Sequence, residues 1–252
     1  MGARIVSLVP SLTELLFELG LGGQVVGRTG FCIHPRGAVD SVTKVGGTKD
    51  VRLERVRELR PTHVILNVDE NRAEHVEQLR RFVPELVLTH PLAPEDNLAL
   101  YREFGERFGV EERAAALARQ LEVELASNRA HAWTPERVLY LIWRDPWKSI
   151  AADTYIAASL ASVGWQVIHG PAGATGAARY PDIDDLDAAA RDADRVLLST
   201  EPYPFTEVHV AKLRKLLPGK PVQLIDAEMT SWYGSRAPAG LAYLRALRET
   251  SS

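Results

Sequence analysis

The side chains of this 252-residue chain that could do chemistry lie mostly just after short apolar runs. Cys32 follows one such run and His34 stands two residues further on, a spacing that a thiol nucleophile could use. A nucleophile of this kind also needs a third, orienting group, and the sequence identifies none. Ser11 is better explained as a helix cap, because Glu14 follows it at the spacing of a capping box. We therefore predict no catalytic residues and a protein that is not an enzyme, with Cys32 chemistry as the alternative.

The seven histidines show no metal-binding pattern. No two of them have the i, i+4 spacing of a helical metal site. A single cysteine excludes an internal disulfide and a cysteine-based zinc site. We predict no bound metal ion and no intrinsic cofactor, although His34 or His169 could be an axial ligand to the cobalt or iron of a bound chelate.

Aromatic side chains gather where predicted strands end, although only 7% of the residues are aromatic. In open parallel sheets, ligands bind beyond the carboxyl ends of the strands. Broad aromatic faces there suit a large, flat, partly apolar ligand. Trp147 and Trp232 could instead cover the core of the second half of the chain. The predicted ligand-binding residues at these strand ends are Pro10, Ser11, Phe31, Cys32, Gly47, Asn67, Trp143, Trp147, Glu201, Tyr203, Trp232 and Tyr233.

The elements that must position these residues alternate between strand and helix. Residues 1–93 contain the apolar runs "RIVSLV", "QVVGRT", "THVILN" and "ELVLTH", separated by amphipathic helical patterns. Residues 133–252 repeat the alternation with "RVLYLIW", "WQVI", "RVLLST" and "VQLIDA". Such alternation indicates mostly parallel sheets covered by helices. The predicted fold class is α/β, with two Rossmann-like lobes.

Residues 94–132 have a different pattern, which is helical almost throughout with one break near Gly109. We predict that they form a long backbone helix joining an N-terminal lobe, residues 1–93, to a C-terminal lobe, residues 133–252. The halves also match in layout, because "PTHVILNVDENRAEHVEQL" and "ADRVLLSTEPYPFTEVHVAKL" both read as strand, polar turn and helix. This is a topological pseudo-repeat.

The composition is that of an ordinary soluble globular protein, with 46% hydrophobic and 25% charged residues. The net charge of −3 gives no reason to expect nucleic acid or an anionic membrane as a partner. The first residues, "MGARIVSLVPS", show no basic leader followed by an apolar segment. If that absence is native, we expect a cytoplasmic protein; otherwise a signal peptide has been removed. A monomer is the default expectation.

Several segments resemble one protein family. "RIVSLVPSLTELLFELGLGGQVVGRT" and "KVGGTKDVRLERVRELRPTHVIL" resemble the helical-backbone (class III) substrate-binding proteins of ABC importers. "WRDPWKSIAADTYIAASLASVGW" and "SWYGSR" resemble the cobalamin-binding branch of that family. The resemblance covers essentially the whole chain. It implies two lobes that hold the ligand in a cleft, a permease as partner and a periplasmic or other extracytoplasmic location.

The resemblance also implies docking on the permease through one acidic residue per lobe. Glu74 and Glu207 occupy matching places in the pseudo-repeat, early in the helix after a strand. Glu70 and Glu77 compete with Glu74, and Glu201 competes with Glu207. Acidic residues at helix starts also favour the helix dipole without any partner.

The function we expect is the binding of a corrinoid (vitamin B12-like) or related metal chelate for delivery to an ABC importer. One alternative is a cytoplasmic corrinoid or tetrapyrrole carrier or sensor. Another is a siderophore or haem receptor.

Overall fold

The computed structural model describes residues 2–168, 170 and 173–251, and the chain divides into two compact units. Unit 1 takes in the chain up to Pro91, Asn97–Arg119 and the short segment Tyr233–Ser235. Unit 2 takes in Leu92–Asp96, Gln120–Trp232 and the chain from Arg236 onward. Each unit has its own parallel sheet with helices on both faces, which confirms the predicted α/β class.

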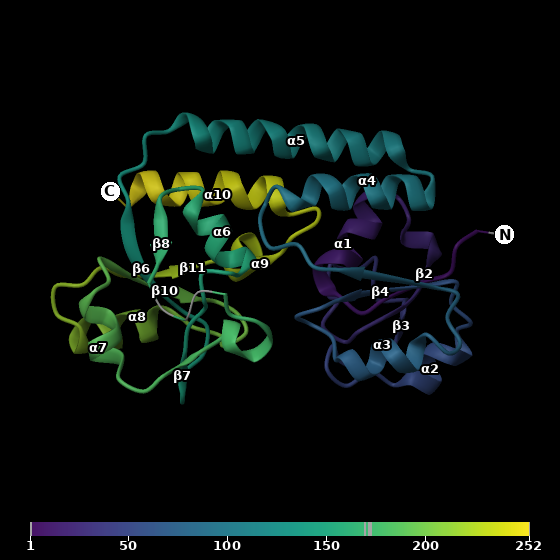
Figure 1. Cartoon of the computed structure of the whole chain (residues 1–252), viewed down its shortest axis with the longest axis horizontal. Coiled ribbons are helices and arrows are strands. Elements are labelled where there is room, and N and C mark those ends of the chain that lie inside the picture. Colours follow the sequence, from purple (N-terminus) through teal and green to yellow (C-terminus); the bar gives the residue numbers. More distant parts are fainter. Residues whose placement is uncertain (1, 169, 171–172, 252) are drawn as a thin grey trace. The chain divides into compact units, whose positions relative to one another are not determined.

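Unit 1 is built on a five-stranded parallel sheet in the order β3-β2-β1-β4-β5. Figure 1 shows α2 and α3 on the opposite side of this sheet from α1 and α4. The elements are β1 (Ile5–Ser7), α1 (Pro10–Glu18), the 3-10 turn η1 (Gly22–Gln24), β2 (Val25–Arg28), β3 (Thr43–Lys44), α2 (Leu53–Glu58), β4 (His63–Asn67), α3 (Ala73–Leu79), β5 (Glu85–Thr89) and α4 (Asp96–Phe108).

The central strands of unit 1, β1 and β4, are buried on both faces, as expected for a covered parallel sheet. Val64 and Leu66 of β4 pack with Val56 of α2 and Leu79 of α3. Ile65 lies between Val64 and Leu66 in the strand, so its side chain points to the other face, where it is also fully buried. This continuous burial explains why β4 reads as an unbroken apolar run.

Helix α1 begins earlier than the sequence pattern predicts. Its N-cap is Val9, and Pro10 occupies the first turn, where a proline loses no helical hydrogen bond. Ser11 is therefore inside the helix and does not cap it, so the predicted capping box with Glu14 is wrong. The helix ends as predicted, because Gly20 adopts a positive φ of 79° just after the C-cap Leu19.

Three late residues of the chain complete unit 1. Gly234 donates its backbone N–H to Asn97 Oδ1 at 2.6 Å and accepts a 2.7 Å hydrogen bond from the hydroxyl of Tyr101. Its φ is +85°, and an added Cβ would lie 3.3 Å from the Cβ of Leu15. A glycine therefore suits this close approach to α1.

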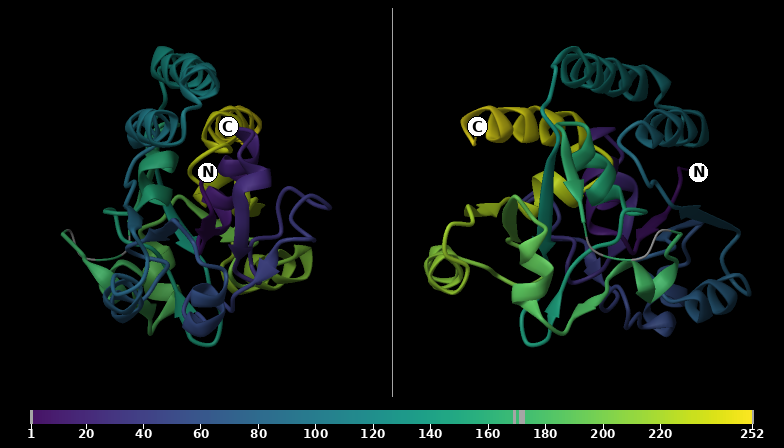
Figure 2. Two further views of the ribbon diagram at one scale, coloured as in Figure 1. Left: turned by 90° about the vertical axis from the view of Figure 1, so that its right-hand side faces the viewer. Right: turned by 60° about the vertical axis from the view of Figure 1, so that its left-hand side comes forward.

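Unit 2 is built on a four-stranded parallel sheet in the order β11-β10-β6-β8, with a separate antiparallel pair, β7-β9. The views of Figures 1 and 2 place α6 and α10 on one side of the sheet and α8 on the other. The elements are β6 (Glu136–Leu141), β7 (Trp147–Lys148), α6 (Tyr155–Ala161), β8 (Trp165–Val167), η2 (Gly176–Arg179), β9 (Asp182–Ile183), α7 (Leu186–Arg191), β10 (Arg195–Ser199), α8 (Glu207–Leu216), β11 (Val222–Ile225), α9 (Ala227–Ser231) and α10 (Ala237–Thr250).

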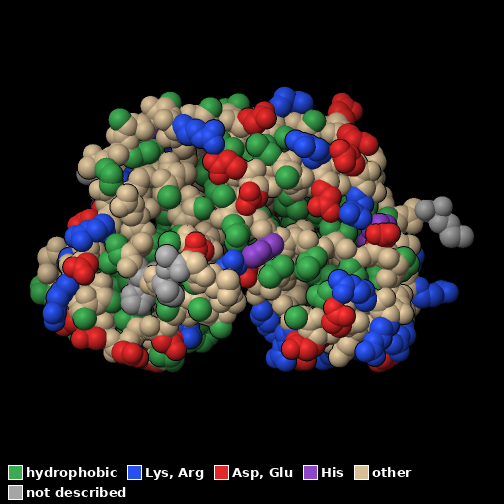
Figure 3. Space-filling view, in the orientation of Figure 1, with side chains coloured by type: hydrophobic (Ala, Val, Ile, Leu, Met, Phe, Trp, Pro, Cys, Tyr) green, Lys and Arg blue, Asp and Glu red, His purple; other side chains and the backbone are tan. Residues whose placement is uncertain are grey.

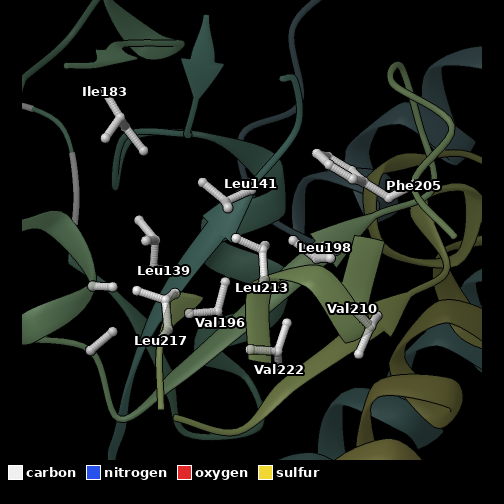
Figure 4. Close-up of a cluster of buried hydrophobic side chains, with 12 residues drawn as sticks. Leu139, Leu141, Ile183, Val196, Leu198, Phe205, Val210, Leu213, Leu217 and Val222 are labelled. Carbon is white, nitrogen blue, oxygen red and sulfur yellow. The ribbon is translucent and has the colours of Figure 1, made fainter. Parts of the chain in front are cut away.

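Strand β6 sorts its side chains between two cores. Leu139 and Leu141 pack with Leu213 of α8 in the cluster of Figure 4. Val138 and Tyr140 pack on the opposite face with Leu160 of α6 and Leu244 of α10. The sheet is therefore the middle layer of three, which holds the carboxyl ends of its strands in fixed positions.

Helix α5 (Glu111–Ala130) follows α4 after the break predicted near Gly109, where φ is +68°. Its 20 residues rise about 30 Å. The division between the units falls within α5, after Arg119. Within the residues that the structure describes, no helix combines the length and the apolar character needed to cross a bilayer.

Candidate functional site

The segment after β6 forms a tight hairpin that carries two predicted site residues. Ile142 and Trp143 exchange backbone hydrogen bonds with Lys148, and Asp145 adopts a positive φ of 58° at the turn. This geometry sends Trp143 to the surface, where 38% of it is exposed. Its ring stands edge-on to Tyr203, with centroids 5.7 Å apart and planes at 77°. Trp143 and Tyr203 thus form an accessible aromatic corner at the carboxyl edge of the unit 2 sheet.

Trp147 has a different environment. Its ring is parallel to that of buried Phe205, with centroids 6.1 Å apart, and it packs against the core cluster that contains Leu139 and Leu213. This placement supports the core-covering interpretation of Trp147. Phe205 was not among the predicted residues, although its position two residues after Tyr203 was a usable signal.

His209 holds the turn that presents Tyr203. Its Nδ1 accepts a hydrogen bond from the backbone N–H of Thr206 at 3.0 Å, which completes a capping box at the start of α8. Its ring also stands edge-on to Tyr203, with centroids 5.5 Å apart. The histidine therefore fixes the loop between β10 and α8.

Trp232 and Glu201 lie near a charged group in unit 2. The guanidinium of Arg236 sits 4.7 Å from the centre of the Trp232 ring and forms an ion pair with Glu228. Burial, together with the nearby negative charge of Glu228, raises the pKa of Glu201. The predicted residues Glu201 and Trp232 are thus joined by Glu228 and Arg236, which were not among the predicted ligand-binding residues.

In unit 1, the loop after β2 displays Phe31, which is 64% exposed. The ring lies against Gly47, where an added Cβ would stand 3.3 Å from Phe31 Cε2. Phe31 and Gly47, two predicted site residues, are therefore neighbours at the carboxyl edge of the sheet.

Three other predicted residues of unit 1 are less accessible. Cys32 is fully buried, and its Sγ lies 3.1 Å from the hydroxyl of Thr29. Burial raises the pKa of this thiol. Pro10 is partly exposed, whereas Ser11 is 4% exposed and its Oγ has no hydrogen-bond partner among the described residues.

Asn67, at the end of β4, shapes the loop that follows. Its Oδ1 accepts hydrogen bonds from the backbone N–H groups of Asp69, at 2.8 Å, and Glu70, at 3.2 Å. Asn71 ties the same loop down, because its Nδ2 donates to the carbonyls of Leu8 and Thr48. Asn67, a predicted site residue, is thus buried, and its side chain fixes the backbone of Asp69 and Glu70.

Tyr233 completes this part of unit 1. Its hydroxyl donates a 2.7 Å hydrogen bond to Glu70 Oε1. Burial raises the pKa of Glu70 to about 7, against lowering effects of the Tyr233 hydrogen bond and the Lys49 charge. Lys49 Nζ itself donates to the carbonyl of Asp69 at 2.6 Å. Tyr233 was a predicted ligand-binding residue, whereas Lys49 was not.

The two predicted docking residues lie at helix starts, in different units. Glu74 is in the first turn of α3 and Glu207 is the first residue of α8; both are exposed. The competitors have other contacts, since Glu77 pairs with Arg80 and Glu70 bonds to Tyr233. Acidic and basic side chains are interspersed over the face shown in Figure 3.

In the part of the chain that the structure describes, no group of three or more His, Cys, Asp or Glu side chains could hold a metal ion. His90 is paired instead with Asp69, with 3.2 Å between Nε2 and Oδ2. His169, one of the two candidate axial ligands, lies outside the described residues.

Comparison with known families gives a match to the periplasmic binding protein family over residues 5–215. The chain belongs to this family. Its members are binding proteins, and this membership confirms the expectation that the protein is not an enzyme. The resemblance to substrate-binding proteins is confirmed as well.

Among curated proteins, this periplasmic binding protein is 26% identical over 137 residues to a vitamin B12-binding protein of Vibrio parahaemolyticus. That match covers 54% of the chain and spans half the length of the Vibrio protein.

Solved structures with the same fold match nearly the whole chain. The periplasmic vitamin B12-binding protein BtuF of Vibrio cholerae has a TM-score of 0.82 at 16% identity, covering 99% of this chain and 98% of that one. A periplasmic haem-binding protein from Pseudomonas aeruginosa has a TM-score of 0.77 at 22% identity, covering 100% and 94%. At these identities the likeness establishes the fold alone.

Proposed function

We propose that this protein holds a corrinoid or a related metal chelate against the carboxyl edges of its sheets and delivers it to an ABC importer outside the cytoplasm. The observation that carries the proposal is the exposed Trp143 ring, held edge-on to Tyr203 at the edge of the unit 2 sheet. Such an aromatic surface suits a macrocycle, because ring faces give a large apolar contact at low entropic cost. The likeness to a vitamin B12-binding protein supports the corrinoid as the first choice.

The unit 1 sheet offers a second surface of the same kind. Phe31 is 64% exposed and its ring lies beside Gly47, where a side chain would crowd it. Both surfaces follow the rule that ligands of parallel sheets lie at the carboxyl ends of the strands. Ser11, Cys32 and Asn67 are buried, so we propose that they support these surfaces and that Phe31, Trp143 and Tyr203 make the direct contacts.

The direct test is a titration with cyanocobalamin, hydroxocobalamin, haemin and a ferric siderophore, followed by tryptophan fluorescence. We expect quenching by a corrinoid with micromolar or tighter affinity, and a large loss of affinity in Trp143→Ala. Trp133→Phe is the matched control, because Trp133 precedes the amino end of β6 and bonds to the carbonyl of Asn128. Tighter binding of haemin or the siderophore would select the haem or siderophore alternative, and no binding of any of the four would refute the proposal.

For the partner, we propose that Glu74 and Glu207 contact the permease. They carry exposed negative charge on separate units, whereas Glu77 is paired with Arg80. The loaded protein should cosediment with membranes of its own cell, and Glu74→Lys combined with Glu207→Lys should abolish this while leaving ligand affinity unchanged. Glu77→Lys is the control; an equal effect of this variant would contradict the assignment.

A further inference from the structure

A tyrosine–carboxyl pair in unit 1 has the properties of a ligand contact. The Tyr233 hydroxyl donates to Glu70 Oε1 at 2.7 Å, and Tyr233 is 7% exposed whereas Glu70 keeps more of its surface accessible. Among the described residues, Tyr233 is the only side chain that donates a hydrogen bond to this carboxylate. A carboxylate can accept about four hydrogen bonds, so Glu70 retains acceptor capacity toward the solvent.

The backbone around Glu70 is fixed before any ligand arrives. Asn67 Oδ1 accepts hydrogen bonds from the N–H groups of Asp69 and Glu70, and Asn71 bonds to the carbonyls of Leu8 and Thr48. The opposite side of the pair is fixed too, since Tyr233 precedes Gly234, which Asn97 and Tyr101 hold. A preorganised acceptor loses little conformational entropy on binding and discriminates well between ligands.

Charges of both signs act on Glu70. Lys49 lowers its pKa and Asp69 raises it, while the dominant influence is burial, which raises the pKa to about 7. The Lys49 ammonium donates a hydrogen bond to the backbone carbonyl of Asp69, and the Asp69 carboxylate pairs with His90. An additional negative charge beside ionised Glu70 would therefore meet repulsion at low local dielectric.

We propose that Glu70, oriented by Tyr233, is a specificity determinant that accepts hydrogen bonds from neutral donor groups of the ligand, such as carboxamides, and disfavours carboxylates at the same place. The inference rests on the proposed function, because it names the ligand groups that this surface recognises. A corrinoid presents carboxamides around its ring, whereas haem presents carboxylates. Glu70 would thus favour the corrinoid over haem, which the aromatic surfaces would also accept.

The test compares cyanocobalamin with its isomeric monocarboxylic acids, in each of which one peripheral carboxamide is replaced by a carboxylate. For the wild type near pH 8, we expect one isomer to bind at least about tenfold more weakly than the parent because of like-charge repulsion. Glu70→Gln removes the charge, keeps an acceptor for Tyr233 and should remove that difference. Glu77→Gln is the control, because it changes an exposed acid on α3 that pairs with Arg80. This variant should keep the difference in affinity between the parent and that isomer.

A pH series separates Glu70 from its neighbours. The penalty for the carboxylate isomer should shrink between about pH 8 and about pH 6 in the wild type, since Glu70 becomes protonated in that range. Asp69, Lys49, His90 and Tyr233 remain in Glu70→Gln, so any pH dependence left in this variant belongs to them. Tyr233→Phe should weaken binding of the parent because Glu70 loses the bond that orients it.

The outcomes separate the two proposals. If the wild type binds the parent and every isomer equally, or if the penalty persists in Glu70→Gln, this inference is overturned while the corrinoid function stands. If the wild type binds neither the parent nor any isomer, the proposed function fails and the inference fails with it. If one isomer binds more weakly than the parent to the wild type and to Glu77→Gln, and as tightly as the parent to Glu70→Gln, the result supports both proposals.

Discussion

Arg195 Nε lies 2.9 Å from the carboxylate of Glu136 in the interior of unit 2, where 9% and 14% of the two side chains are exposed. The other carboxylate oxygen of Glu136 accepts a hydrogen bond from Trp165 Nε1 at 2.8 Å and pairs with Arg248 Nη1 at 3.1 Å. This one carboxylate therefore compensates two buried cations at the amino end of β6.

We expect Glu136→Ala to lower the free energy of unfolding by about 3 to 5 kcal/mol, because it leaves buried arginines without their counter-charge. Urea denaturation of the variant and the wild type measures this directly. Glu54→Ala is the control, since the Glu54–Arg57 pair is exposed and contributes about 0 to 1 kcal/mol. Equal losses of unfolding free energy in the two variants would mean that the buried Glu136 ion pairs stabilise the protein no more than an exposed pair does.

Stability should also depend on pH through Glu70. Its pKa is about 7 in the folded protein and close to the ordinary value of 4.5 in the unfolded chain. The folded state therefore holds a proton that the unfolded state releases, so this contribution is fully present below pH 4.5 and is lost as the pH rises through 7. Over that range it amounts to at most about 3 kcal/mol. Denaturation at several pH values should show the decline in the wild type and not in Glu70→Gln.

Asn71 should be important for stability because its buried side chain satisfies three backbone groups. It donates to the carbonyls of Leu8 and Thr48 and accepts from the N–H of Asn67 at 2.9 Å. Asn71→Ala should lower the free energy of unfolding by about 3 kcal/mol or more, since three backbone groups lose their partner and each buried group left unbonded costs about 1 to 3 kcal/mol. Asn71→Ser, which offers a shorter polar side chain, should not restore the wild-type stability. A loss below about 0.5 kcal/mol for the alanine variant would contradict this account.

Two glycines make a matched pair for a packing test. An added Cβ at Gly240 of α10 would lie 2.2 Å from the carbonyl oxygen of Met229, which belongs to α9. Backbone atoms cannot give way cheaply, so Gly240→Ala should destabilise by about 1 to 3 kcal/mol. Gly23 has no atom within 4 Å of its built Cβ, and Gly23→Ala should change stability by less than about 0.5 kcal/mol. Thermal unfolding of both variants checks the difference.

Cys32 should be unreactive while the protein is folded. The thiol is fully buried and its pKa is raised by desolvation, so little thiolate is exposed to reagents at neutral pH. Labelling with a disulfide reagent should be slow in buffer and fast in concentrated guanidinium chloride. Fast labelling of the native protein would reopen the hypothesis that Cys32 does chemistry.

The strands that position the site were predictable because their physical cause is local. β4 and β10 are covered on both faces, and such strands appear in the sequence as unbroken apolar runs. The place of Trp143 at a strand end was predictable for the same reason, because it closes the apolar run "RVLYLIW". The two-residue strands β3, β7 and β9 were missed because so few residues show no periodicity.

The interactions that were missed join residues far apart in the sequence. Tyr233 and Glu70 are separated by 163 positions, and neither residue indicates the other. Glu136, Arg195 and Arg248 look like ordinary solvated charges until the fold brings them together. The error at Ser11 has a local cause: Pro10 starts the helix one residue before the serine that resembled its cap.

The segment Tyr233–Ser235 makes the assembly of unit 1 depend on residues that are synthesised long after the rest of the unit. Most of unit 1 leaves the ribosome first, yet Tyr101 and Asn97 acquire their Gly234 hydrogen bonds only when residue 234 has been made. A nascent chain that stops earlier has an N-terminal unit with an unfilled position beside α1. Such a chain would open more readily and expose its backbone to proteases. Unit 1 is therefore fully packed only in chains that extend through residues 233–235.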